Sequence, residues 1–226
     1  MNTDRNRAVV LNRVREALGA RRDDERRRQA VADRLRKHLR NTMPARAQGG
    51  REILLQLFEI MLRGQGAEVV LAATPEDAVR AIDADLRTQN LGSSLRLGAD
   101  PALATLPWGA APSVDLRHGK GEPSDEVALS RAVVAAAETG TLFLVSGADN
   151  PTTLAFLPEQ HIILIRSQDV VGAYEEAFDR LRGMYGEGAL PRTVNMISGP
   201  SRTADIEQTI VRGAHGPKRL LVVILG

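Results

Sequence analysis

The residues of this sequence best suited to chemistry lie in its second half, in short polar segments beside predicted strands. Glu138 is followed by Thr139, Gly140 and Thr141, directly before an apolar run. A carboxylate beside two hydroxyls has the groups that a general base or a nucleophile needs. A single Glu at a helix end is usually solvated, so from the residues alone a structural turn with Gly140 as the helix stop is favoured. Glu138 is nonetheless the candidate catalytic residue, and its three neighbours are candidate ligand-binding residues.

A second polar segment, SGPSRTADIE, runs from Ser198 to Glu207. It follows a predicted strand and opens a predicted helix, where unpaired backbone N–H groups and hydroxyls would meet an anion. Arg202 adds a guanidinium for a bidentate contact. The structural alternative is that Ser201 or Thr203 caps the helix, while the acidic residues after them complement the helix dipole and repel a phosphate. The candidate ligand-binding residues here are Ser198, Gly199, Ser201, Arg202, Thr203 and Asp205.

The third segment is the turn around His215, before the last apolar run. An imidazole there would titrate near neutrality and is a candidate ligand-binding group. A plain turn also explains the segment, with Gly213 ending a helix and Pro217 preventing its continuation. The histidines, at positions 38, 118, 161 and 215, show no HxH or HExxH spacing, so no metal site is predicted.

The loop 149–153 (DNPTT) is a turn-rich stretch after a strand. It either presents polar groups to a ligand or only turns the chain. In open parallel sheets, ligands favour the loops beyond the carboxyl ends of strands. We therefore expect a ligand near the turns after Val145 and Ile197. No GxxxxGK[ST], GxGxxG or GxSxG motif is present, which removes the nucleotide-loop and hydrolase-elbow hypotheses.

Composition limits the function further. The 226 residues include no cysteine, so this chain supplies no thiolate for an iron–sulfur cluster, a disulfide or thiol catalysis. No apolar run approaches the roughly 18 residues of a membrane span, and the N-terminus lacks a signal sequence, so a cytoplasmic protein is expected. Aromatic residues make up 3% of the chain, which argues against stacking on single-stranded nucleic acid.

Charge separates an N-terminal arm from the rest. Residues 1–40 hold 13 Lys and Arg against 6 Asp and Glu, a net +7, and the remaining 17 against 22 give −5. Helical spacing predicts helices at 5–18 and 23–40, and the segment 41–50 (NTMPARAQGG) is typical of a linker. We expect a basic helical arm at 1–42 and an α/β domain at 43–226. The arginine cluster at 26–28 is diluted by nearby acids, so this pattern argues against nucleic-acid binding and favours a docking arm.

Periodicity in the domain predicts an α/β fold, an open, largely parallel sheet flanked by helices, because runs such as HIILI and LLVVIL are nearly continuous apolar runs. The predicted helices are 51–63, one starting at Thr74, 125–137, 168–182 and 203–212. The predicted strands are 67–73, 94–97, 141–145, 161–166, 193–197 and 219–225. Residues 100–124 are expected to be mostly irregular.

Four blocks resemble the lactate utilization protein C family, also called the LUD domain family. They are AETGTLFLVSG at 137–147, LPEQHIILI at 157–165, SGPSRTADIE at 198–207 and GAHGPKRLLVVIL at 213–225. They occur in the family's order, whereas residues 51–124 match only in general layout. The positions that carry the family's motifs here are Glu138, Thr139, Gly140, Thr141, Ser198, Gly199, Pro200, Ser201, Arg202, Thr203, Asp205, Glu207, His215, Gly216 and Pro217.

The resemblance implies a fold like that of the sugar-phosphate isomerase and coenzyme A transferase superfamily. It also implies a role beside two iron–sulfur partner proteins that oxidise L-lactate to pyruvate, which supports growth on lactate. This chain would then be a non-redox accessory subunit of that L-lactate dehydrogenase system, binding no cofactor itself, with the iron–sulfur clusters in its partners. A homo-oligomer is also compatible with the sequence. The alternative is a stand-alone small-molecule enzyme of the same superfamily, with Glu138 as nucleophile or a phosphorylated substrate at 198–203.

Overall fold

The computed structural model describes residues 3–19, 24–186, 189, 191–206, 209–213 and 215–226, with the backbone alone for 3–5, 203–206 and 209–212. The chain divides into two compact units, Met1–Thr42 and Met43–Gly226. Each unit is described by itself.

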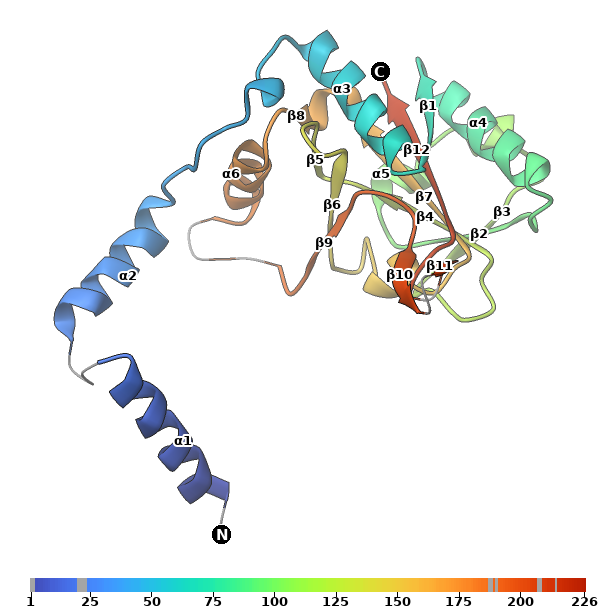
Figure 1. Cartoon of the computed structure of the whole chain (residues 1–226). Helices are drawn as coiled ribbons and strands as arrows, with labels where there is room; N and C mark the ends of the chain where they lie inside the picture. The colour runs from blue at the N-terminus through green and yellow to red at the C-terminus, as the bar shows by residue number, and fades with distance from the viewer. Residues whose placement is uncertain (1–2, 20–23, 187–188, 190, 207–208, 214) are drawn as a thin grey trace. The chain divides into compact units, whose positions relative to one another are not determined.

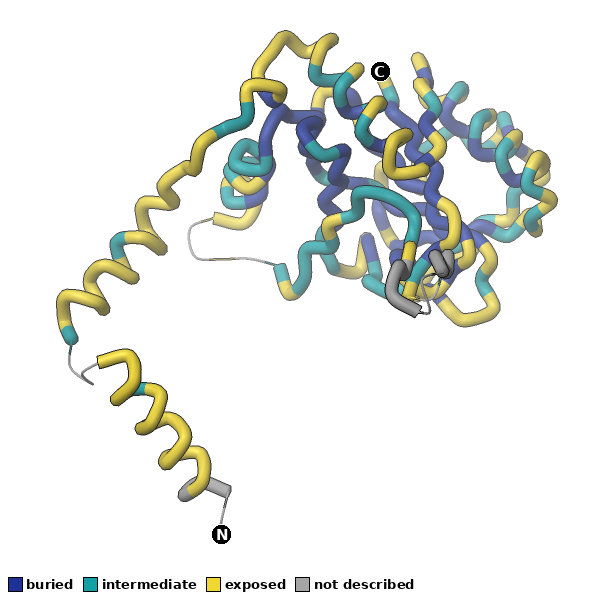
Figure 2. Tube along the Cα trace, viewed as in Figure 1, coloured by how far each residue is buried: buried dark blue, intermediate teal, exposed yellow. Residues whose placement is uncertain are grey.

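The first unit contains two helices, α1 (Thr3–Ala17) and α2 (Glu25–Lys37), as the sequence predicts. Asp24 begins α2 by accepting a hydrogen bond from the backbone N–H of Arg27 at 3.1 Å. The large apolar residues of both helices are exposed, including Val10, Val14 and Leu35. Figure 2 shows that almost all described residues of the two helices are exposed. Neither apolar stripe forms a hydrophobic core.

The second unit is built on a six-stranded parallel sheet in the order β1-β12-β7-β4-β2-β3 (Figure 1). These strands are β1 (Glu68–Ala72), β12 (Arg219–Leu225), β7 (Gln160–Arg166), β4 (Val127–Arg131), β2 (Ser94–Leu97) and β3 (Asp115–His118). The predicted α/β class with an open, largely parallel sheet is confirmed. The strand β3 lies in the segment expected to be irregular.

Helices cover both faces of this sheet, which explains the continuous apolar runs of its central strands. Ile163 and Ile165 of β7 belong to the core under α3 (Arg51–Gly64). Ile162 and Leu164 point to the other face and belong to the core under α4 (Pro75–Thr88). Successive side chains of a strand point to opposite faces, so both sets must be apolar when both faces are covered.

A second, four-stranded sheet has the order β8-β5-β6-β9, where β5 pairs parallel to β8 and the other pairs are antiparallel. The strands are β8 (Val170–Val171), β5 (Val134–Ala136), β6 (Thr141–Val145) and β9 (Val194–Ile197). Helix α6 (Tyr174–Tyr185) packs on it, with Phe143 in edge-to-face contact with Tyr174 and Phe178.

The remaining elements are short. A hairpin is formed by β10 (Arg202–Ile206) and β11 (Thr209–Arg212), and one short α-helix is α5 (Pro101–Ala104). The 3₁₀ helices are η1 (Ala45–Ala47), η2 (Trp108–Ala110), η3 (Thr152–Ala155) and η4 (Ser167–Asp169). No helix within the described residues is long and apolar enough to cross a membrane.

The helix predicted at 125–137 is wrong: the segment forms the strands β4 and β5. Its alanines favour a helix, but Val127 to Ser130 are all buried, in a strand between β2 and β7. Tertiary burial on two faces therefore overrides local propensity. Gly140 consequently ends no helix and lies in the turn between β5 and β6.

The helix predicted at 203–212 is also wrong, because the segment forms the β10–β11 hairpin. Half of these ten residues are β-branched, which favours strands. No helix opens at Ser201 or Thr203 to be capped, and none ends at Gly213. The helix predicted from residue 168 starts at Tyr174, because residues 170–171 pair with β5 first.

Candidate functional site

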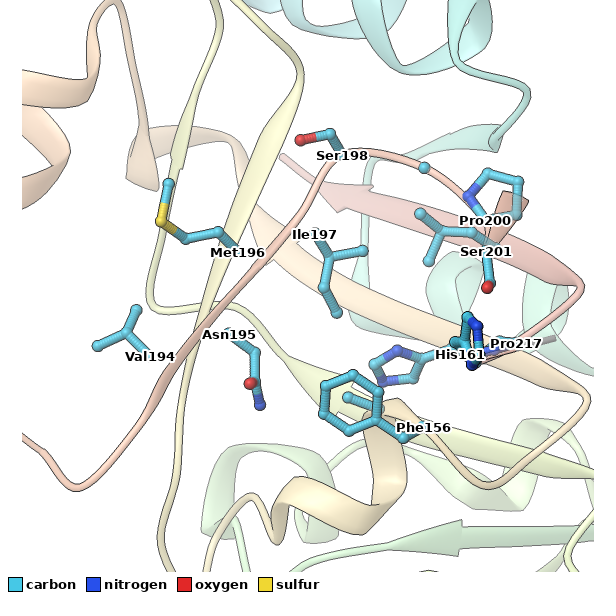
Figure 3. Close-up of a pocket in the computed structure, with 15 residues that line it drawn as sticks. Phe156, His161, Val194, Asn195, Met196, Ile197, Ser198, Pro200, Ser201 and Pro217 are labelled. Carbon is cyan, nitrogen blue, oxygen red and sulfur yellow. The ribbon is translucent and has the colours of Figure 1, made fainter. Parts of the chain in front are cut away.

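A cavity of about 340 Å³ lies beside the edge strand β9 (Figure 3). Four other segments border it: the end of η3, the amino end of β7, the amino end of β12, and the loop around Pro217. The lining residues are Ala155, Phe156, His161, Val194, Asn195, Met196, Ile197, Ser198, Gly199, Pro200, Ser201, His215, Gly216, Pro217 and Leu220. The cavity is large enough for a small metabolite.

Strand alternation decides which side chains of β9 enter the cavity. Figure 3 shows Asn195 and Ile197 on the side of Phe156 and His161, while Met196 is turned to the other side. The Nδ2 atom of Asn195 is buried and has no hydrogen-bond partner in the described part of the chain. An unpaired buried amide N–H costs free energy, so this donor would gain from an acceptor supplied by a ligand.

His161 forms part of the cavity wall and is 1% exposed. Its Nε2 pairs with the Ser130 hydroxyl at 2.9 Å. Burial lowers the pKa of His161 to about 3, because a charged ring would lose its hydration without gaining a counter-charge. At neutral pH the ring is therefore an uncharged hydrogen-bonding group.

The Ser198 hydroxyl is held by a network of hydroxyls behind β9. Thr141 Oγ1 lies 2.7 Å from Ser198 Oγ and 2.7 Å from Tyr174 Oη. Thr139 Oγ1 lies 2.7 Å from Thr141 Oγ1 and donates to Tyr174 Oη at 3.1 Å. This network joins two of the predicted segments and fixes the end of β9, so Ser198 borders the cavity chiefly through its backbone.

The loop after β9 is tied to the segment before β12. Ser201 donates its backbone N–H to the Pro217 carbonyl at 2.8 Å, and the Ser201 carbonyl accepts from Gly213 at 3.1 Å. These bonds place Ser201 and His215 on the same wall of the cavity, although 13 residues separate the two along the chain. His215 is exposed and also borders a neighbouring polar cleft with Glu159 and Lys218.

The lining contains no Asp, Glu, Lys or Arg among its described residues. Arg202 does not enter it: its exposed guanidinium lies against Gly66, where a Cβ atom would overlap it. The proposed anion site at a helix N-terminus has no helix to form it. With amide, hydroxyl and neutral imidazole groups among apolar walls, the cavity suits a small uncharged or weakly charged polar molecule.

Glu138 lies outside this lining. The residue is 6% exposed, and its carboxylate accepts a hydrogen bond from the backbone N–H of Tyr174, the first residue of α6, at 2.9 Å. Negative charge near a helix N-terminus stabilises the helix. Its candidate catalytic role therefore stays a prediction, beside a structural contact that the structure gives it.

The structure brings together part of the predicted site. Ser198, Gly199, Ser201 and His215 line the cavity, and Thr139 and Thr141 reach it through Ser198. Gly140 lies in the adjoining turn, and the side chains of Thr203 and Asp205 are outside the described residues. The turns after Val145 and Ile197 are not at one edge of a parallel sheet, because β6 and β9 run antiparallel.

Among the lining residues that sequence reasoning missed are Phe156, His161 and Asn195. The usable signal was His161, a polar residue entering the apolar run HIILI, because a buried polar ring in a strand needs a partner. Asn195 and Phe156 carried no comparable signal. No group of three or more His, Cys, Asp or Glu that could hold a metal ion occurs among the residues with described positions.

Comparison with known proteins places this cavity within a family domain. Residues 124–225 match the model of the LUD domain, and every lining residue falls in this range. Lactate utilization protein C of Shouchella clausii is 34% identical over 100 residues, 44% of each chain. Lactate utilization protein C of Deinococcus radiodurans is 36% identical over 112 residues, 49% of this chain and 51% of that protein.

A longer match is found with the uncharacterized protein YkgG of Escherichia coli, 28% identical over 177 residues, 77% of this chain and 75% of that protein. The matches to the two lactate utilization proteins thus span about half of those proteins' lengths. A crystal structure of a DUF162 family protein from Deinococcus radiodurans aligns with a TM-score of 0.56 at 23% identity, covering 79% of this chain and all of that chain, which shows a shared fold. The resemblance seen in the four sequence blocks is confirmed, because residues 124–225 match the LUD domain and the similar proteins include several named lactate utilization protein C.

Proposed function

We propose that this chain is a non-redox subunit of an iron–sulfur system that oxidises L-lactate to pyruvate in the cytoplasm. The observation that carries the proposal is the similarity of its LUD domain to proteins named lactate utilization protein C. Oxidation of lactate to pyruvate releases two electrons and two protons, and the electrons must pass to a redox group. This chain has no cysteine for an iron–sulfur cluster, so the clusters are assigned to two partner proteins.

The cavity beside β9 gives this subunit a place to bind a small metabolite. Its unpaired Asn195 amide and the neutral His161 ring are hydrogen-bonding groups for a polar ligand, and Phe156 and Leu220 give apolar contact. The arm, whose apolar side chains are exposed, is proposed as a docking element for a partner or a second copy.

Deletion of the gene tests the proposal directly. Cells without it are expected to stop growing on L-lactate and to grow normally on pyruvate, because only the oxidation step is lost. Complementation with the wild-type chain should restore growth, and complementation with Asn195→Leu should not. The control variant Ser113→Ala, far from the cavity in sequence and on an exposed loop, should complement fully.

A pull-down separates a subunit from an isolated enzyme. The tagged chain, recovered from lactate-grown cells, is expected to bring cysteine-rich iron–sulfur proteins and L-lactate-dependent reduction of an electron acceptor. Recovery of the chain alone, together with normal growth of the deletion strain on L-lactate, would refute the proposal.

A stand-alone enzyme of the coenzyme A transferase and sugar-phosphate isomerase-like superfamily is the second candidate. It is favoured by the convergence of polar groups on a small cavity. Turnover of an acyl-coenzyme A or a sugar phosphate by the purified chain, lost in Glu138→Gln with the fold intact, would support it. Absence of turnover with a broad panel of both substrate classes would count against it.

A further inference from the structure

A second cavity, of about 210 Å³, lies at the carboxyl ends of two strands of the parallel sheet. Arg131 is the last residue of β4, and Asp100 follows the end of β2 by three residues. The loop after β6 closes it, because Ala99 donates its backbone N–H to the Ala148 carbonyl at 3.0 Å. The carboxyl edge of a parallel sheet is where open α/β folds usually bind ligands.

Arg131 is fixed in this cavity by one of its three guanidinium nitrogens. Its Nε donates to Asp100 Oδ2 at 2.7 Å. Asp100 is 4% exposed, and its other oxygen accepts from the backbone N–H of Ala102 at 2.9 Å, so the carboxylate cannot turn away. The two terminal nitrogens of Arg131 have no hydrogen-bond partner among the described residues. Such a held guanidinium presents a planar fork for a carboxylate.

Asn150 supplies the second observation. It is 7% exposed and lines the same cavity, and its Oδ1 atom is buried without a hydrogen-bond partner in the described part of the chain. Its Nδ2 donates to the Val145 carbonyl at 3.3 Å, which leaves the oxygen as the free acceptor. A buried carbonyl oxygen without a donor costs free energy until a ligand O–H or N–H pairs with it.

We propose that this cavity binds a small 2-hydroxycarboxylate, with the carboxylate on Arg131 and the hydroxyl donating to Asn150. The charges agree: Asp100 is already paired with Arg131, and Asp149, which also lines the cavity, is exposed to solvent, where its charge is screened. A 2-oxoacid has no hydroxyl to donate, so the same site disfavours it. The site is argued from its residues alone, and only the choice of L-lactate as a probe rests on the proposed function.

Calorimetric titration of the full chain with L-lactate, glycolate, pyruvate and propionate tests the proposal. The two hydroxy acids are expected to bind at least about tenfold tighter than propionate and pyruvate. Arg131→Lys keeps a positive charge beside Asp100 but loses the fork, and should weaken binding of every hydroxy acid at least about tenfold. Asn150→Leu should reduce hydroxy-acid affinity to that of propionate and leave propionate unchanged.

Arg117→Lys is the matched control, because Arg117 also pairs through Nε with an aspartate, Asp115 at 3.1 Å, but on an exposed strand. It should bind all four acids like the wild type. Wild-type affinity in Arg131→Lys, or no saturable binding of either hydroxy acid up to about 10 mM, well above common substrate levels, would overturn the proposal. If the chain binds glycolate but not L-lactate, the result supports the hydroxycarboxylate site and counts against the proposed role in lactate oxidation. The experiment therefore distinguishes a failure of the site from a failure of the proposed function.

Discussion

The imidazole of His161 carries no charge at neutral pH because the ring is buried without a counter-ion. Its hydroxyl partner, Ser130, bonds equally well to a neutral ring, so nothing at this position favours protonation. The neutral state of this part of the cavity wall thus follows from burial rather than from residue type.

This burial predicts a dependence of stability on pH. The folded pKa of about 3 lies below the ordinary value of 6.5, so between these values only the unfolded chain binds the proton. The contribution of the His161 ring to the free energy of unfolding is complete above pH 6.5 and is lost as the pH falls toward 3. Urea unfolding should show about 2 kcal/mol less stability at pH 5 than at pH 7 from this residue.

The variant His161→Gln should remove most of that pH dependence, because glutamine does not titrate. His215→Gln, at an exposed histidine, should leave the dependence as in the wild type. If the unfolding free energy of His161→Gln falls with pH as steeply as that of the wild type, the buried ring is not the source of the pH dependence.

Gly140 allows the turn between β5 and β6 to approach helix α3. Its φ is +66°, and a Cβ there would lie 2.8 Å from the backbone nitrogen of Leu62. Gly140→Ala should therefore destabilise the fold by about 2–3 kcal/mol, through both backbone strain and overlap. The check is a denaturant titration beside Gly183→Ala, at a helical glycine with open space around it, which should be stabilising by up to about 1 kcal/mol. Similar effects of the two substitutions would contradict this reading.

Among the elements, α6 is the one whose start depends on distant residues. Two carboxylates bind the backbone N–H groups around its start: Glu138 accepts from Tyr174, the first helical residue, and Glu176 accepts from the preceding Gly172 and Ala173 at 2.8 and 3.1 Å. The helix therefore begins where β5 and the turn after β8 bring these groups together. The sequence places a helix here but not its first residue.

Removal of the Glu138 carboxylate should weaken this helix start. Glu138→Ala is expected to cost about 2 kcal/mol of unfolding free energy, because a buried N–H loses its acceptor, whereas Glu138→Gln, which keeps an acceptor, should cost less. Glu175→Ala, in the same first turn but with no hydrogen bond in the described structure, is the control and should stay within about 0.5 kcal/mol. Chemical denaturation measures all three variants. An unfolding free energy of Glu138→Ala equal to that of the wild type would show that the Glu138 carboxylate does not stabilise the start of α6.

For the molecule as a whole, the core belongs to the unit at residues 43–226. Helix α2 has no buried residue, and the large apolar side chains of the first unit are exposed. A chain starting at Met43 should therefore unfold with the same free energy as the full chain, within about 0.5 kcal/mol. Thermal and urea unfolding of both chains check this, and a clearly less stable truncated chain would show that the arm contributes to the fold.

The sequence by itself determined the fold class and most elements. Continuous apolar runs such as residues 162–165 and 220–225 indicate strands covered on both faces, and the capping pattern at Thr74 marks a helix start. The four motif blocks also pointed to the LUD domain family, whose model matches residues 124–225. These features are local, because periodicity and capping depend on neighbours within a few residues.

Only the tertiary structure decided the segments 125–137 and 203–212 and the membership of the site. Residues 127–130 form a strand because two neighbouring strands pair with them, and no local pattern encodes such pairing. Asn195, His161 and Ser201 line one cavity through antiparallel pairing and loop bonds across the chain. Burial, which fixes the neutral His161 ring and the unpaired Asn150 oxygen, exists only after these distant segments pack together.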